Sequence, residues 1–147
     1  MPLKNVLPGA SSVPEYQVSS VPFLTSSADS VELDTTPIQI EFPRVTRYIV
    51  VTNTSDEAQA ALRIGFTENG INAAETSNYL VLSGAQSTPR LELRCKTLFL
   101  RADGSANTGF SLMAGLTTIE RQQYLQMTAS FAPFTTGSLL DIFSGVG

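Results

Sequence analysis

The sequence predicts an all-β domain, built as an antiparallel sandwich or barrel of about seven or eight short strands. Short stretches alternate between apolar and polar residues, and turn residues separate them roughly every eight to twelve positions. No long amphipathic helix lies between these stretches, which disfavours a parallel sheet built of βαβ units. At 147 residues the chain is long enough for one domain with its own core, without disulfides or metal.

Composition divides the chain into three parts. Residues 1–30 contain four prolines, which forbid a long helix, yet these residues are too apolar for a solvated linker. We therefore expect an extended N-terminal arm that lies along a surface, either of its own domain or of a neighbouring subunit. The alternative is a frayed terminus. Residues 31–118 form the β domain, and residues 119–147 form a C-terminal segment with an apolar tail.

The strands expected in the domain are marked by alternation and by β-branched or aromatic residues. The signal is strongest over residues 46–52, where valine, isoleucine, threonine and tyrosine dominate, and residues 78–82 are expected to be a buried strand. The expected strands are residues 31–34, 38–42, 46–52, 61–66, 78–82, 90–102 and 110–116. Turns are expected at residues 53–56, 68–70, 83–84 and 103–104.

Residues 90–102 place Leu91, Leu93 and Cys95 on one parity and charged residues on the other. This is typical of a strand with one wet face. At Thr97 the alternation slips, because three large apolar residues follow in a row. A strand with one wet face does not accommodate that run without a bulge, a turn or a second covered face. The slip therefore marks a passage from a half-buried strand to a more deeply buried one.

The C-terminal part leaves two questions. Residues 119–127 fit a short helix or a final strand equally well. Residues 138–147 carry four large apolar side chains, and fully burying one such side chain is worth about 1.5–3 kcal/mol. We therefore expect this tail to dock on a surface.

Composition gives little support to catalysis. The chain has no histidine, the commonest general base and zinc ligand, and no glycine-rich phosphate loop. We therefore expect no cofactor, no metal and no enzymatic activity. The single cysteine, Cys95, is expected to be a small buried hydrophobe in a chain made in a reducing, cytosol-like compartment. One short match, Asp34-Thr35-Thr36, resembles an aspartic-protease motif but is better explained as a turn at a strand end.

The composition also limits which partners the protein can bind. The net charge is −4 and the nine basic residues are scattered, which argues against nucleic acid as the main ligand. No apolar run reaches the roughly 18 residues of a membrane span, and no apolar stretch of a secretory signal follows Lys4.

Five segments, in their order along the chain, resemble the small single-jelly-roll penton proteins at the five-fold vertices of large icosahedral double-stranded DNA viruses. The segments are Tyr-Ile-Val-Val-Thr-Asn-Thr (48–54), Leu-Arg-Ile-Gly-Phe-Thr-Glu-Asn-Gly (62–70), Asn-Tyr-Leu-Val-Leu-Ser-Gly (78–84), Arg-Leu-Glu-Leu-Arg-Cys-Lys-Thr-Leu-Phe-Leu-Arg (90–101) and Phe-Ser-Leu-Met-Ala-Gly-Leu-Thr (110–117). The resemblance covers roughly residues 31–118 and lies in strand pattern and size. It implies an antiparallel single jelly roll of about eight strands, with extended N- and C-terminal arms.

The resemblance also implies a structural capsid protein in the virion, synthesised in host cytoplasm and closed into a homopentamer by heterologous contacts. Its partners would be itself and neighbouring capsid proteins, and no catalytic or cofactor-binding residue is carried over. The subunit-interface candidates are Val6, Leu7, Val21, Phe23, Leu24, Leu139, Leu140, Ile142 and Phe143.

Two other functions stay open. One is a receptor- or carbohydrate-binding jelly-roll module of a virus or phage spike, to which Asn78 or Tyr79 would contribute. The other is a hydrolase, for which Asp34 would be the first residue to replace.

Overall fold

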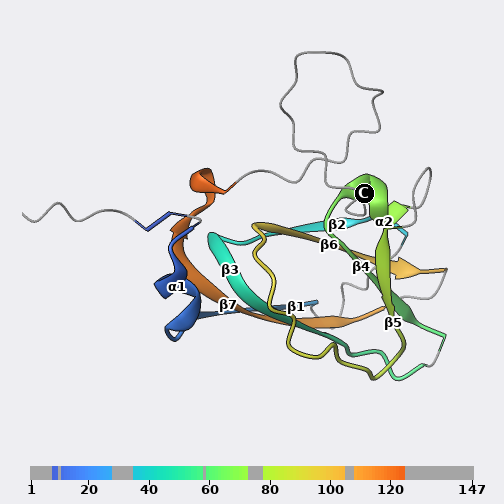
Figure 1. Cartoon of the computed structure of the whole chain (residues 1–147). Coiled ribbons are helices and arrows are strands. Elements are labelled where there is room, and N and C mark those ends of the chain that lie inside the picture. The colour runs from blue at the N-terminus through green and yellow to red at the C-terminus, as the bar shows by residue number, and fades with distance from the viewer. Residues whose placement is uncertain are drawn as a thin grey trace, which may run out of the picture.

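The computed structural model describes residues 8–9, 11–27, 35–57, 59–72, 78–104 and 108–124. Within these residues the chain is all-β, with seven strands in two antiparallel sheets and only short helices (Figure 1). The elements are α1 (Val13–Gln17), β1 (Val21–Ser26), β2 (Ile38–Glu41), β3 (Arg44–Asn53), β4 (Ala61–Gly65), α2 (Glu68–Asn72), β5 (Tyr79–Leu82), β6 (Thr97–Asp103), β7 (Phe110–Glu120) and the 3₁₀ turn η1 (Arg121–Gln123).

The strand order is β1-β7-β3 in the first sheet and β2-β6-β4-β5 in the second. The two sheets lie face to face, and their inward side chains form one core. At one flank Phe23 of β1 packs edge-on against Phe42, with ring centroids 5.3 Å apart. At the opposite flank the Asn53 side-chain amide, at the end of β3, donates hydrogen bonds to the carbonyls of Ala60 and Leu82. The flank that holds β1 and β2 is therefore opposite the flank that holds β5.

Residues 86–95 run beside β3 without forming a regular strand. They join it through isolated antiparallel bridges between Leu91 and Ile49 and between Ser87 and Thr52. Cys95 is buried beside Thr46 of β3, as expected for a small hydrophobe, whereas Glu92 is exposed. The predicted alternation of burial is thus confirmed, although the backbone is not a regular strand.

The slip at Thr97 coincides with a change of sheet. Residues 86–95 lie against β3 in the first sheet, whereas β6 begins at Thr97 in the second. In β6 the side chains of Leu98 and Leu100 are fully buried, and each faces a residue of β2 across the sheet. The more deeply buried strand predicted after Thr97 is therefore β6, with neighbours on both sides.

Several local predictions need correction. The strand predicted at 78–82 is not buried, because β5 is an edge strand that exposes Leu80 and Val81. The turn predicted at 68–70 is the short helix α2, whose Gly70 N–H donates to the Thr67 hydroxyl. The stretch 119–127 continues β7 to Glu120 and then forms η1, as far as it is described. The strand expected at 31–34 lies outside the described residues.

Candidate functional site

Three of the nine predicted interface residues lie in the described part of the chain, and all three belong to β1. Val21 and Leu24 are 57% and 70% exposed, although both are large and apolar. Phe23 points inward and is half-buried against Phe42. The other six candidates lie outside the described residues; they are Val6, Leu7, Leu139, Leu140, Ile142 and Phe143.

β1 is an edge strand of the first sheet, paired along its length with β7. Part of the arm expected at 1–30 therefore lies along its own domain. The preceding segment is fastened to the same sheet by two side chains. Glu15 of α1 accepts hydrogen bonds from the backbone N–H and the hydroxyl of Thr118, and Arg47 donates to the carbonyl of Val18. These contacts fix the position of the β1 edge.

A groove of about 530 Å³ opens at this flank, between the segment before α1, the start of β3 and the end of β7. Its lining is mostly apolar and includes Pro8, Val21, Pro43 and Leu116. Arg44 and Glu120 also line it, and their side chains form a loose ion pair of 3.6 Å. The groove thus combines exposed carbon surface with one charge of each sign.

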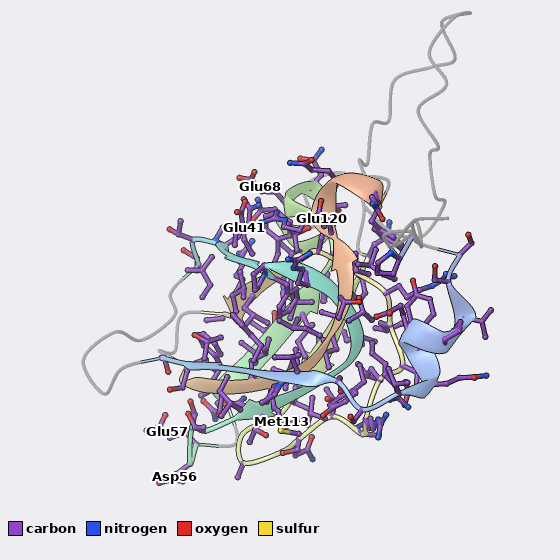
Figure 2. All side chains as sticks on the ribbon, turned by 90° about the vertical axis from the view of Figure 1, so that its left-hand side faces the viewer. Glu41, Asp56, Glu57, Glu68, Met113 and Glu120 are labelled. Carbon is purple, nitrogen blue, oxygen red and sulfur yellow. The ribbon has the colours of Figure 1, made fainter. Side chains whose placement is uncertain are left out.

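The outer face of the first sheet carries further apolar surface beside the groove. Leu24 of β1 lies opposite Met113 of β7, which is 41% exposed, and Met113 is paired on its other side with Val50 of β3. Figure 2 shows Met113 at the outer surface of the domain. Further along β7, Gly115 leaves room for the ring of Tyr48, since a Cβ there would lie 2.3 Å from a ring carbon.

The opposite flank has its own apolar edge. In β5 both Leu80 and Val81 are about half-exposed, at 51% and 52%. Successive residues of a strand point to opposite faces, so β5 presents apolar surface on both faces of its edge. Leu80 is in register with the buried Ile64 of β4, so its exposure results from its position at the edge rather than from the face it occupies.

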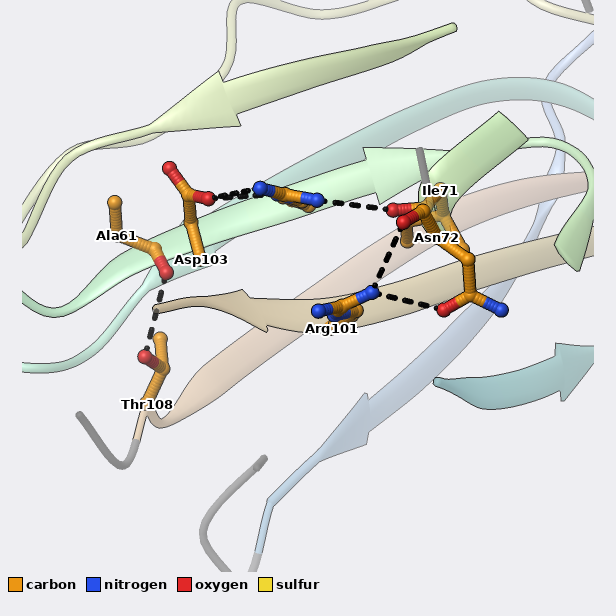
Figure 3. A network of polar contacts seen from close by, with 7 residues as sticks. Ala61, Ile71, Asn72, Arg101, Asp103 and Thr108 are labelled. Atoms are coloured by element: carbon orange, nitrogen blue, oxygen red, sulfur yellow. Dashed lines mark hydrogen bonds and ion pairs between the residues drawn. The ribbon is translucent and has the colours of Figure 1, made fainter. Parts of the chain in front are cut away.

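Two arginines on the outer face of the second sheet contact groups within the domain. Arg63 of β4 contacts Asp103 at 2.5 Å, donates to the Ile71 carbonyl and lies over the ring of Tyr79. Arg101 of β6, directly opposite Arg63, donates to the carbonyl and the side-chain oxygen of Asn72 (Figure 3). The two arginines therefore hold α2 against the sheet.

Burial of Cys95 raises the pKa of its thiol from an ordinary 9.0 to about 11, although a hydrogen bond with Thr46 acts in the opposite direction. The thiol therefore stays protonated at neutral pH and is a poor nucleophile. Within the described ranges, no three His, Cys, Asp or Glu side chains group so as to hold a metal ion. The described part of the chain also has no helix long and apolar enough to cross a membrane.

Sequence reasoning missed two parts of these surfaces. The groove depends on Pro8, Pro43 and Leu116, which come from three distant segments, and no local pattern joins them. The sequence does contain a signal for the exposed apolar edge of β5. Residues 79–82 are a four-residue run of apolar side chains followed by Ser83-Gly84, which fits a buried strand and an apolar edge equally well.

Comparison with known proteins adds little. No family model matches this sequence, and no curated protein is significantly similar to it. One solved structure, from work on Bacillus endospore appendages that form disulfide-linked pili, matches with a TM-score of 0.35 and 13% sequence identity. The match covers 68% of this chain and 93% of that chain. A similarity this low carries no argument about function.

Proposed function

We propose that this chain is a structural subunit of an icosahedral virus capsid, of the penton kind, which closes a five-membered ring through its two flanks. The observation that carries this proposal is the exposure of large apolar side chains on edge strands at opposite flanks of the sandwich. Leu24 and Val21 belong to β1, and Leu80 and Val81 belong to β5. A cyclic ring with head-to-tail contacts needs two such different surfaces on each subunit.

The strand pairing supports the finer fold that this proposal needs, an eight-stranded jelly roll. If residues 86–95 count as a strand, the first strand pairs with the last, β1 with β7, and the second with the seventh, β2 with β6. The third pairs with the sixth, β3 with residues 86–95, and the fourth with the fifth, β4 with β5. Such a pairing supports a jelly roll, in which one long hairpin is rolled into two facing sheets.

The fold alone does not imply a capsid role, because jelly rolls serve many functions. Support for the virion comes from the resemblance of residues 31–118 to penton proteins. The resembling segments coincide with β3, with β4 and α2, with β5, with β6 and the residues before it, and with β7. They therefore cover most of the sandwich rather than one local motif.

In the proposed ring, the β1 flank of one subunit packs against the β5 flank of the next. An edge strand presents unpaired backbone N–H and C=O groups as well as its side chains, and a neighbour covers both. Fully burying one large apolar side chain is worth about 1.5–3 kcal/mol, and each of the four named residues is about half-exposed or more in the single chain. Under this proposal the protein acts by shape and resides in the virion.

The test uses two variants that each damage one flank, Leu24→Asp and Leu80→Asp. We expect the unaltered chain to form a closed ring by native mass spectrometry, and each variant alone to lose it. A mixture of the two variants retains one good flank of each kind, so it should form a dimer of two different chains and no ring. Ser26→Asp is the matched control, since Ser26 is exposed on the same strand and face as Leu24.

Two results would contradict the proposal. A chain that stays strictly monomeric at every concentration, with no particle formed, removes it altogether. A ring that survives both Leu24→Asp and Leu80→Asp shows that assembly does not use these flanks.

A further inference from the structure

We propose that the groove at the β1 flank binds residues 138–143 of a neighbouring copy of this chain. The inference rests on the proposed function, because it gives the β1 flank a second contact in the assembly, in the groove beside the edge strand that packs on the next subunit. The occupant would supply Leu139, Leu140, Ile142 and Phe143, which lie close together in the sequence.

The size and chemistry of the groove fit this occupant. A cavity of roughly 150 Å³ holds one benzene-sized group, so a groove of about 530 Å³ holds about three large apolar side chains. Its lining is mostly apolar, with Val21 and Leu116 among the residues that contribute. Arg44 and Glu120 line the groove as a loose ion pair, and Asp141 is the single charged residue of the segment. The groove therefore matches the apolar residues of 138–143 in volume and in lining.

The position of the groove shows where this segment starts from. The description of the chain ends at Tyr124, only four residues after Glu120, which lines the groove. The carbonyl of Tyr124 accepts a hydrogen bond from the Lys96 ammonium, which holds this end of the described chain against the domain. The last described residue, Tyr124, is therefore held against the domain only a few residues along the chain from the groove.

The length of the intervening chain favours a neighbour over the same copy. Fourteen residues, 125–138, separate Tyr124 from Leu139. A return to a groove beside the exit point needs only a short connection, and connections within compact domains are typically about four to six residues. Fourteen residues reach up to about 45–50 Å when extended. A domain of about 100 residues has a radius of gyration of roughly 13 Å, so this reach extends across an adjacent subunit.

The experiment uses the full chain with Val21→Cys and Ile142→Cys together. Val21 lines the groove and is exposed, and the native Cys95 is buried, so the new thiols alone are expected to react. After mild oxidation, a non-reducing denaturing gel should shift from monomers to a ladder of covalent multimers. Separately tagged chains that carry one new cysteine each should, when co-expressed, form a disulfide between the two tags.

Leu24→Cys with Ile142→Cys is the matched control. Leu24 lies on the same strand and is more exposed than Val21, at 70% against 57%, but it does not line the groove. Accessibility alone would make the control crosslink at least as well, whereas specific binding in the groove leaves it monomeric. If Val21→Cys impairs folding, Pro43→Cys with Ile142→Cys repeats the test, since Pro43 is an exposed residue of the same groove.

Three results overturn the inference. Monomers that migrate faster after oxidation place the segment in its own groove, and equal crosslinking of the control removes specificity. A ring that forms in native mass spectrometry while the groove pair stays uncrosslinked removes this inference and leaves the proposed function standing. A chain that never assembles removes the proposed function itself.

Discussion

Residues 86–95 and β6 follow one another in the chain, yet they join their sheets in different ways. β6 pairs residue by residue with β2 on one side and with β4 on the other. Residues 86–95 join β3 through two isolated bridges, at Ser87 and Leu91, and through a few backbone hydrogen bonds around them rather than a continuous ladder. Pro89 lies between the two bridges, and proline has no N–H to give to a ladder.

Side-chain hydroxyls supplement the interrupted backbone pairing of residues 86–95 with β3. The Thr88 hydroxyl accepts a hydrogen bond from the Val51 N–H at 3.0 Å, and the Ser87 and Thr52 hydroxyls lie 2.6 Å apart. At the other end the Thr46 hydroxyl donates to the Leu93 carbonyl and accepts from the Cys95 N–H. The comparison teaches that alternation in a sequence records which side chains face the core, and not whether the backbone pairs regularly.

The largest difference between the two segments should appear when a leucine is truncated in each. Leu100→Ala removes a fully buried side chain of β6 and should lower the free energy of unfolding by about 2–5 kcal/mol. Leu91→Ala removes a half-buried side chain, and we expect a clearly smaller loss. Urea unfolding of both variants measures the two values. Equal losses would show that residues 86–95 are packed as tightly as β6.

The second prediction is that ionisation of Cys95, at the end of residues 86–95, makes the stability of the protein depend on pH. In the unfolded chain its thiol ionises near its ordinary pKa of 9.0, whereas in the folded protein burial raises that pKa to about 11. Between these values the unfolded state has lost the proton and the folded state has kept it, so raising the pH favours unfolding. The stability that the protonated, buried thiol allows is fully present below pH 9 and is lost as the pH rises to about 11. A shift of this size corresponds to about 2–3 kcal/mol.

Cys95→Ala isolates this contribution. Tyr124 couples to the thiol, because its pKa is raised by burial and also by the charge of Cys95. The remaining ionisable groups are common to both proteins, so the difference between the two pH profiles reports the thiol together with this coupling. The profile of the unaltered chain should fall more steeply between pH 9 and pH 11 in urea unfolding. Parallel profiles would show that the thiol is not buried in the folded protein.

Much of the fold could be predicted from the sequence because most strands have one buried face. In residues 38–42 and 61–66, alternating apolar residues indicate strands that the structure places at β2 and β4. The prediction that residues 78–82 form a buried strand is wrong, because a run of apolar residues looks the same in a buried strand and at an apolar edge. The partner of residues 86–95 was also beyond prediction, since it depends on long-range pairing with β3.

The candidate site was less predictable than the fold. Val21 and Leu24 were selected as apolar residues of an arm, and the structure places both at an exposed edge. The groove and its charges were not foreseen, because Pro8, Arg44 and Glu120 come together only when β3 and β7 pair. Composition identifies apolar residues that require cover, whereas only the tertiary pairing shows which surface is available to cover them.

The third prediction concerns the hydroxyl of Thr46, which joins residues 86–95 to the start of β3. Thr46→Val keeps the shape of the side chain but leaves the Cys95 N–H and the Leu93 carbonyl without this partner. Because Thr46 is fully buried, we expect a loss of about 1–3 kcal/mol in urea unfolding. Thr46→Ser retains the hydroxyl and should recover most of that loss. If serine is as destabilising as valine, the methyl group contributes as much as the hydroxyl, and a Thr46→Val variant as stable as the unaltered chain would show that these hydrogen bonds contribute nothing.

The smallest effect is expected at the other end of residues 86–95, where the hydroxyl contact is exposed. Ser87→Ala breaks the contact with Thr52, and water can replace it, so the loss should stay within about 0.5 kcal/mol. Thr88→Val, one residue along, removes the partly buried acceptor of the Val51 N–H and should cost about 1–2 kcal/mol. Chemical denaturation of the two variants under the same conditions gives the comparison. A Ser87→Ala loss as large as that of Thr88→Val would contradict this expectation. It would mean that the exposed hydroxyl of Ser87 holds residues 86–95 against β3 as firmly as the partly buried hydroxyl of Thr88 does.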